Sequence, residues 1–155
     1  MVLPFILAMN VTAWVAYVAG WLTGGHTERL AVAVLITHAL LELPFRDWHV
    51  QGLDVGIAAG QVPLLLFFGR MALTTNRWWP MAAAAIMGLI MLVHLLTVTT
   101  PLSYFSAASA RVGLWLMLHL TVLVGVAECW LAGEAPVSRF AAWGRRPTPP
   151  ASTAA

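Results

Sequence analysis

The chain has 155 residues, of which 61% are hydrophobic and only 9% are charged. A soluble domain carries about 25% charged residues and about 45–50% apolar ones, so this composition predicts an integral membrane protein. The eight basic residues are all arginine, and with six acidic residues they leave a net charge of +2, which excludes a basic nucleic-acid-binding surface. The single cysteine, Cys129, excludes an internal disulfide.

Five apolar segments are candidates for membrane spans. A helix that crosses the hydrocarbon core of roughly 30 Å needs about 20 apolar residues. In chain order, the candidate segments are residues 2–23, 30–45, 53–69, 78–100 and 107–131. The first has no basic residues before it and no small-residue cleavage site, so we interpret it as a retained span and not as a signal peptide. The sequence therefore predicts an all-α bundle of five transmembrane helices within residues 1–133.

The arginines predict how the chain is threaded through the membrane, because basic residues of short loops stay on the cytoplasmic side. Five spans with the N-terminus outside and the C-terminus inside place six arginines in the cytoplasm: Arg29, Arg70, Arg77, Arg139, Arg145 and Arg146. Only Arg46 and Arg111 remain at the outer side. A four-span alternative would split the basic residues between the two sides, so we prefer the five-span orientation.

Tryptophan marks the predicted span ends. Six of the eight tryptophans fall there, where an indole favours the headgroup level: Trp21, Trp48, Trp78, Trp79, Trp130 and Trp143. We interpret these six as interfacial anchors. Trp14 and Trp115 lie deeper, and we expect them to face lipid or to be packed.

Residues 134–155 differ from the rest of the chain. Charged residues mixed with Phe140 and Trp143 predict a short segment lying along the cytoplasmic surface. Pro147, Pro149 and Pro150 among small polar residues cannot continue a helix, which predicts a disordered tail.

The third segment begins with a ridge of small residues. Gly52, Gly56 and Gly60 recur at every fourth position, which lets another backbone approach closely. The ridge predicts tight packing within the chain or an interface with another membrane protein or a second copy. Gln61 and Pro63 follow, and Gln61 could satisfy a carbonyl that the proline frees one turn earlier.

Ionisable side chains inside the spans are the candidate functional residues, because each costs about 2.5–3.5 kcal/mol to insert and therefore faces the bundle or a wet cavity. His38 and Glu42 share one face of the second span, and Arg111 and His119 share one face of the fifth, with Trp115 between them. Converted to depth, these groups lie in the outer half of the membrane. The complete candidate cluster is His38, Glu42, Asp54, His94, Arg111 and His119.

Three interpretations of this cluster remain open. In the first, Glu42 or Asp54 pairs with Arg111 and the histidines bond to neighbouring helices, which stabilises the bundle. In the second, His38 and His119 are axial ligands of a b-type haem, or one of them binds a bacteriochlorophyll. In the third, the cluster lines a half-channel that relays protons or binds a small anion from the outer side.

We predict neither a metal site nor catalytic residues. HxxxH, HExxH and CxxC are absent from the sequence, and Met87, Met91 and His94 on one face of the fourth span are interpreted as packing and not as a Cu(I) site. Cys129 lies near the inner end, away from the histidines, so a Cys/His catalytic pair is not expected.

The stretches PFRDWH (44–49), NRWWP (76–80) and LVHL (92–95) resemble short polytopic inner-membrane proteins of GC-rich proteobacteria. That family carries no assigned activity, so the resemblance implies a bacterial inner membrane and no chemistry. From the small size and the glycine ridge we expect an accessory or structural protein that packs against other membrane-protein subunits. The alternative is a redox or proton-handling protein that uses the intramembrane His, Glu and Arg residues.

Overall fold

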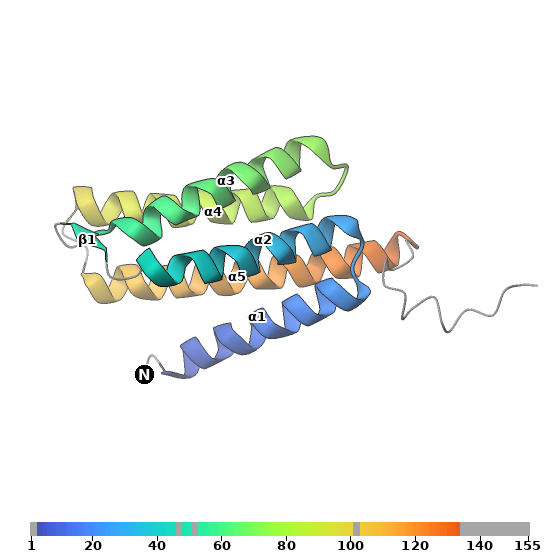
Figure 1. The fold of residues 1–155 in the computed structure, drawn as a ribbon, viewed down its shortest axis with the longest axis horizontal. Coiled ribbons are helices and arrows are strands. Elements are labelled where there is room, and N and C mark those ends of the chain that lie inside the picture. The colour runs from blue at the N-terminus through green and yellow to red at the C-terminus, as the bar shows by residue number, and fades with distance from the viewer. Residues whose placement is uncertain (1–2, 46–47, 51–52, 101–102, 134–155) are drawn as a thin grey trace, which may run out of the picture.

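The computed structural model describes residues 3–45, 48–50, 53–100 and 103–133. Within these ranges the chain forms five α-helices: α1 (Leu3–Thr23), α2 (His26–Glu42), α3 (Val55–Thr74), α4 (Trp79–Thr99) and α5 (Tyr104–Leu131). A turn of 3-10 helix, Leu43–Phe45, extends α2, and two short antiparallel strands, β1 (His49–Val50) and β2 (Leu53–Asp54), lead into α3. Successive helices run in opposite directions (Figure 1). The predicted all-α bundle of five helices is confirmed for the described residues.

Four helices of the described part, α1, α3, α4 and α5, are long and apolar enough to cross a membrane. α2 has 17 residues and is the shortest of the five. Two of the predicted boundaries were wrong. α2 begins at His26 and not at residue 30, because the Glu28 carboxylate accepts the Gly25 N–H at 2.9 Å and caps the helix start. α3 continues past residue 69 to Thr74, because the exposed Arg70 ends the apolar run without interrupting the backbone hydrogen bonds.

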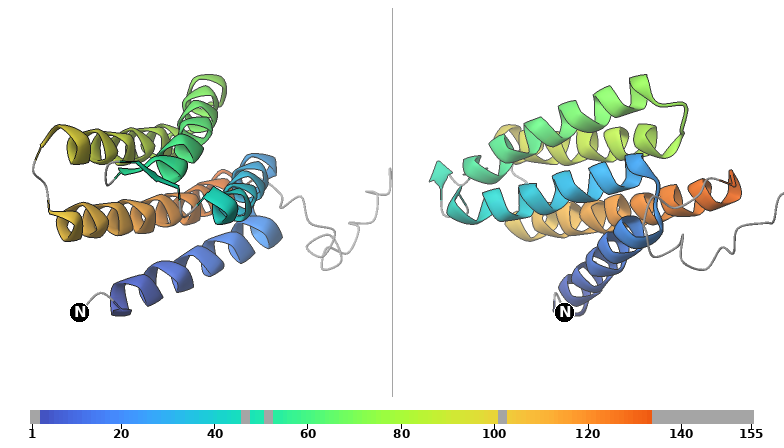
Figure 2. Two further views of the ribbon diagram at one scale, coloured as in Figure 1. Left: turned by 60° about the vertical axis from the view of Figure 1, so that its left-hand side comes forward. Right: turned by 45° about the vertical axis from the view of Figure 1, so that its right-hand side comes forward.

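The core lies along α4, which packs against α3 and against α5, and α2 adds buried side chains to it. α3 packs along α4, α4 along α5 and α1 along α5, while α2 makes narrower contacts with its neighbours. The large side chains that fill the core are fully or almost fully buried, as burial of apolar area requires: Leu35, Phe68, Trp79, Met87 and Leu118. Figure 1 shows α1 separating from α2 toward its N-terminus, and Figure 2 shows the same divergence in two further views.

The alternating helices give the bundle two ends. We call one the Glu28 end, where α1, α3 and α5 finish and α2 and α4 begin, and the other the Arg111 end, where the reverse holds. Arg29, Arg70 and Arg77 lie at the Glu28 end, and Arg111 lies toward the opposite end. The other four arginines lie outside the described residues: Arg46, Arg139, Arg145 and Arg146. Three of the four described arginines therefore lie at the Glu28 end, and the threading through a membrane stays a prediction.

The interpretation of Trp79 as an interfacial anchor was wrong. Trp79 is 0% exposed, because α4 begins with this side chain turned into the core against Phe68. Gly125 on α5 makes room for it, since a Cβ there would lie 2.8 Å from the indole. The anchors that the structure describes at the other span ends are about half exposed: Trp21, Trp48, Trp78 and Trp130. Trp143 and the rest of the predicted tail, residues 134–155, lie outside the described residues.

Candidate functional site

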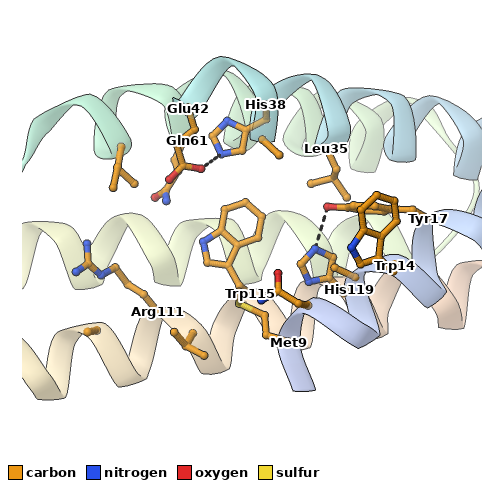
Figure 3. Close-up of a pocket in the computed structure, with 16 residues that line it drawn as sticks. Met9, Trp14, Tyr17, Leu35, His38, Glu42, Gln61, Arg111, Trp115 and His119 are labelled. Carbon is orange, nitrogen blue, oxygen red and sulfur yellow. Dashed lines mark hydrogen bonds and ion pairs between the residues drawn. The ribbon is translucent and has the colours of Figure 1, made fainter. Parts of the chain in front are cut away.

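A cavity of about 650 Å³ opens toward the Arg111 end of the bundle. Its walls come from α1, α2, α3 and α5, and it occupies the region where α1 diverges from α2 (Figures 1 and 3). A cavity of this size lies within the range of about 300–1,000 Å³ that is typical of small-molecule sites. Seven polar side chains line it, Asn10 and six that Figure 3 labels: Tyr17, His38, Glu42, Gln61, Arg111 and His119.

His38 and Glu42 form the α2 wall of the cavity. They lie one turn apart on the same face, and His38 Nε2 is 3.5 Å from Glu42 Oε2. His38 is buried, whereas the Glu42 side chain is 32% exposed. The pair therefore carries one polar group inside the bundle and a second, linked group at the mouth of the cavity.

Trp115 on α5 separates the two histidines of the cavity. Its ring stacks on His38 with a centroid distance of 5.6 Å and an interplanar angle of 10°. The ring of His119 lies 5.9 Å from the same indole at 29°. His119 lies four residues, or one helical turn, after Trp115 on α5, and this spacing places the two rings in contact. We expected Trp115 either to face lipid or to be packed, and the structure shows that it is packed.

Tyr17 on α1 ties the deep end of the cavity to α5. Its hydroxyl lies 3.1 Å from His119 Nε2, within hydrogen-bonding distance, and the two rings meet edge to face at 5.5 Å. His119 is buried, and this bond joins two helices that are far apart in the sequence. Such a bond is what the structural interpretation of the histidines predicts.

Gln61 on α3 was not among the predicted site residues, yet it faces the cavity. It is 1% exposed, and among the described residues its Oε1 has no hydrogen-bond partner. It was expected to satisfy a carbonyl freed by Pro63, but no such bond to the amide is found. A buried acceptor without a donor costs about 1–3 kcal/mol, so it marks a place where a further donor would be stabilised. The signal in the sequence was an amide within an otherwise apolar helix.

The structure brings four of the six predicted cluster residues together around the cavity: His38, Glu42, Arg111 and His119. His94 is buried on α4 and does not line this cavity. Asp54 belongs to β2, and its side chain is outside the described part of the structure. The cluster on α2 and α5 is therefore a spatial site, and His94 is not part of it.

The glycine ridge packs within the chain where the structure describes it. A Cβ at Gly56 would collide with the carbonyl oxygen of Phe45, and a Cβ at Gly60 would contact His38 Cε1 at 3.5 Å. Gly52 lies outside the described residues. The glycines thus let the 3-10 turn and α2 approach α3 closely.

The cavity does not fit a haem held between His38 and His119. A shared iron would need both imidazole nitrogens on opposite sides of one open plane, and here the indole of Trp115 fills that plane. His119 Nε2 already has a hydrogen-bond partner in Tyr17, whereas His38 Nε2 lies 3.5 Å from Glu42 Oε2 and makes no hydrogen bond among the described residues. Among the described residues, no three His, Cys, Asp or Glu side chains gather to hold a metal ion.

A second polar cluster, at the Glu28 end, was missed by the sequence interpretation. Glu28 is 0% exposed and accepts three hydrogen bonds, from the Gly25 N–H at 2.9 Å, Trp79 Nε1 at 3.0 Å and Arg77 Nη1 at 3.3 Å. The signal in the sequence was a capping pattern, with a glutamate three residues after Gly25. Because the carboxylate is fully satisfied and enclosed, it is a structural tie between α2 and the start of α4.

Comparisons of the chain with protein-family models, with curated proteins and with solved structures find no match.

Proposed function

We propose that the chain is a multi-pass membrane protein that binds a small hydrogen-bonding molecule in the cavity at the Arg111 end. The observation that carries the proposal is the gathering of polar side chains from α1, α2, α3 and α5 around one open space, with an acceptor of Gln61 left unused. Convergent polar groups in an otherwise apolar pocket are typical of ligand sites.

Binding is favoured over proton transfer across the bundle. The polar groups fall into two hydrogen-bonded or ion-paired couples, His38 with Glu42 and His119 with Tyr17. The indole of Trp115 stands between the couples and offers its ring faces, which carry no exchangeable proton. Among the described residues no hydrogen bond connects the two couples, so they suit the walls of a site better than a continuous relay.

The chemistry of the walls indicates a hydroxyl-bearing aromatic ligand. Gln61 Oε1 has no donor among the described residues, so a ligand group that reaches it is favoured if it donates, and a hydroxyl group is the simplest donor. Trp14 lines the same space, is 69% exposed and offers a flat apolar surface for a ring to stack on, whereas the faces of Trp115 are taken by His38 and His119. Arg111 and Glu42, at the open side, provide further polar contacts for a second hydroxyl. A benzenediol combines these features.

The test is isothermal titration calorimetry, in which hydroquinone is titrated into the purified protein in lipid nanodiscs. We expect saturable heat that empty nanodiscs do not give, and none with 1,4-dimethoxybenzene, which keeps the ring and lacks the donors. Gln61→Leu should weaken binding at least about tenfold, the effect of about 1.4 kcal/mol. Thr74→Val, on the same helix at the other end, is the matched control. Equal binding of both compounds, or of neither, would overturn the proposal.

We also propose that the chain spans a bacterial inner membrane with its N-terminus outside, so that the cavity faces outward. The arginines at the Glu28 end support this orientation. Reporter fusions after Gly24 and Thr75 should give a cytoplasmic signal, and fusions after Val50 and Ser103 an outside signal. Fusions that fail to alternate would refute the five-span threading.

The hypothesis of an accessory protein that packs against other subunits stays a prediction. It has lost one support, because Gly56 and Gly60 contact this chain itself. Purification in mild detergent, followed by identification of stoichiometric co-purifying membrane proteins, tests it separately from ligand binding.

A further inference from the structure

A second cavity, of about 400 Å³, lies between α2 and α3. It differs from the first in chemistry, because most of its walls are aliphatic or aromatic. The apolar walls come from both helices: Ala33, Val34, Leu41, Phe45, Pro63 and Leu64. A space of this kind takes an apolar group and offers it little hydrogen bonding.

The two cavities share a wall. His38 and Glu42 line both of them. On α3, Gln61 lines the first cavity and its neighbour Gly60 lines the second. Gly60 lies against His38, since a Cβ there would be 3.5 Å from the imidazole, so the shared residue that leaves room between the two cavities is Glu42, which is 32% exposed. The polar and the apolar spaces therefore adjoin along one short stretch of α2 and α3.

We infer that the ligand of the proposed site is amphipathic, with a hydroxyl-bearing ring in the polar cavity and an alkyl or isoprenoid chain that passes the partly exposed Glu42 into the apolar cavity. This inference rests on the proposed function and adds the ligand class to it. The occupant of the second cavity is the apolar chain of the same ligand molecule. The two cavities share His38 and Glu42, and one is polar whereas the other is mostly apolar. A polar ring with an apolar chain satisfies both sets of walls at once.

Binding affinity alone is a poor measure of where the ligand's alkyl chain lies. Lipid solvates an alkyl chain as well as an apolar cavity does, so there is no hydrophobic driving force for its transfer from lipid into the protein. The position of the chain end is therefore the better readout. The probe is a hydroquinone with a ten-carbon chain that ends in a photoreactive diazirine, added to the protein in nanodiscs. After illumination, mass spectrometry identifies the residues that carry the probe.

We expect crosslinks on the less exposed walls of the second cavity, such as Ala33 and Leu64, and their loss when unlabelled decylhydroquinone competes. Gly60→Leu should abolish these crosslinks by filling the second cavity from α3, and Val34→Phe should do so independently from α2. Gly69→Leu is the matched control on α3, because nothing lies within 4 Å of a Cβ at that position, and it should keep the wild-type pattern.

The outcomes separate the inference from the proposed function. Competed crosslinks that fall on the outward-facing Leu66 or Leu73, or that persist in both Gly60→Leu and Val34→Phe, would overturn the inference and leave the polar site standing. Saturable binding of plain hydroquinone with no competed crosslink of the long-chain probe would do the same. A failure of both hydroquinone and the long-chain probe to bind would overturn both.

Discussion

The two ends of the bundle use similar polar residues in opposite ways. At the Glu28 end, a wholly buried carboxylate accepts three hydrogen bonds, and Trp130 Nε1 donates to the Thr23 carbonyl at 3.0 Å, which joins α5 to α1. At the Arg111 end, Glu42 is partly exposed, Gln61 keeps an unused acceptor, and a cavity stands open. The contrast holds for Glu28 itself, because Arg29 Nε and Glu128 Oε2 at the same end are buried without a hydrogen-bond partner among the described residues. Satisfaction together with enclosure marks Glu28 as a structural polar group.

The difference between the two ends is tested most sharply by neutralising one carboxylate at each end. Glu28→Gln leaves Arg77 without its charged partner, and breaking a buried pair costs about 3–5 kcal/mol of unfolding free energy. Glu42→Gln changes a partly exposed group and should cost less than about 1 kcal/mol. Reversible unfolding in mixed micelles, followed by circular dichroism, measures both. Equal losses would contradict the assignment of a structural role to Glu28 alone.

The glycines of α3 offer the next test. Gly56→Ala places a Cβ against the Phe45 carbonyl, so the 3-10 turn must move, and we expect a loss of about 1–3 kcal/mol. Gly69→Ala on the same helix meets no neighbour and should gain up to about 1 kcal/mol from helix propensity. Unfolding of the two variants under the same conditions decides. A Gly56→Ala protein as stable as Gly69→Ala would refute the close approach of the turn to α3.

Trp79 tests the closure of the Glu28 end. Trp79→Phe keeps most of the buried ring and removes the N–H that reaches Glu28, so we expect a loss of about 1–2 kcal/mol. Trp78 is half exposed, and Trp78→Phe should change stability by less than about 0.5 kcal/mol. If Trp78→Phe is the more damaging of the two, the assignment of Trp79 to the core is wrong.

The smallest expected effect concerns the bond at the deep end of the cavity. Tyr17→Phe removes the hydroxyl near His119 Nε2 and should lower stability by about 0.5–1.5 kcal/mol. A double-mutant cycle with His119→Phe isolates the pair, and a coupling energy indistinguishable from zero would show that the hydroxyl and the imidazole do not interact.

The number of helices could be predicted from the sequence because the length of an apolar run is a local property. Likewise, the spacing of His38 and Glu42, and of Arg111 and His119, placed each pair on one face before any packing was known. These pairs are the part of the cavity that could be predicted.

The remaining features depend on how each helix is rotated against its neighbours. That rotation turns Trp79 inward, leaves His94 away from the cavity and turns Gln61 toward it, and no single-helix pattern contains it. The tie at Glu28 joins residues some fifty positions apart, which a reading of local motifs does not connect.

The central claim is that polar groups at the Arg111 end bind a ligand and those at the Glu28 end hold the fold. The most direct test is the calorimetric titration of Gln61→Leu with hydroquinone, with its unfolding free energy measured on the same preparation. The account predicts binding weakened at least about tenfold and stability unchanged or raised, because the substitution removes a buried acceptor that has no donor within the chain. Unchanged binding together with a clear loss of stability would contradict it.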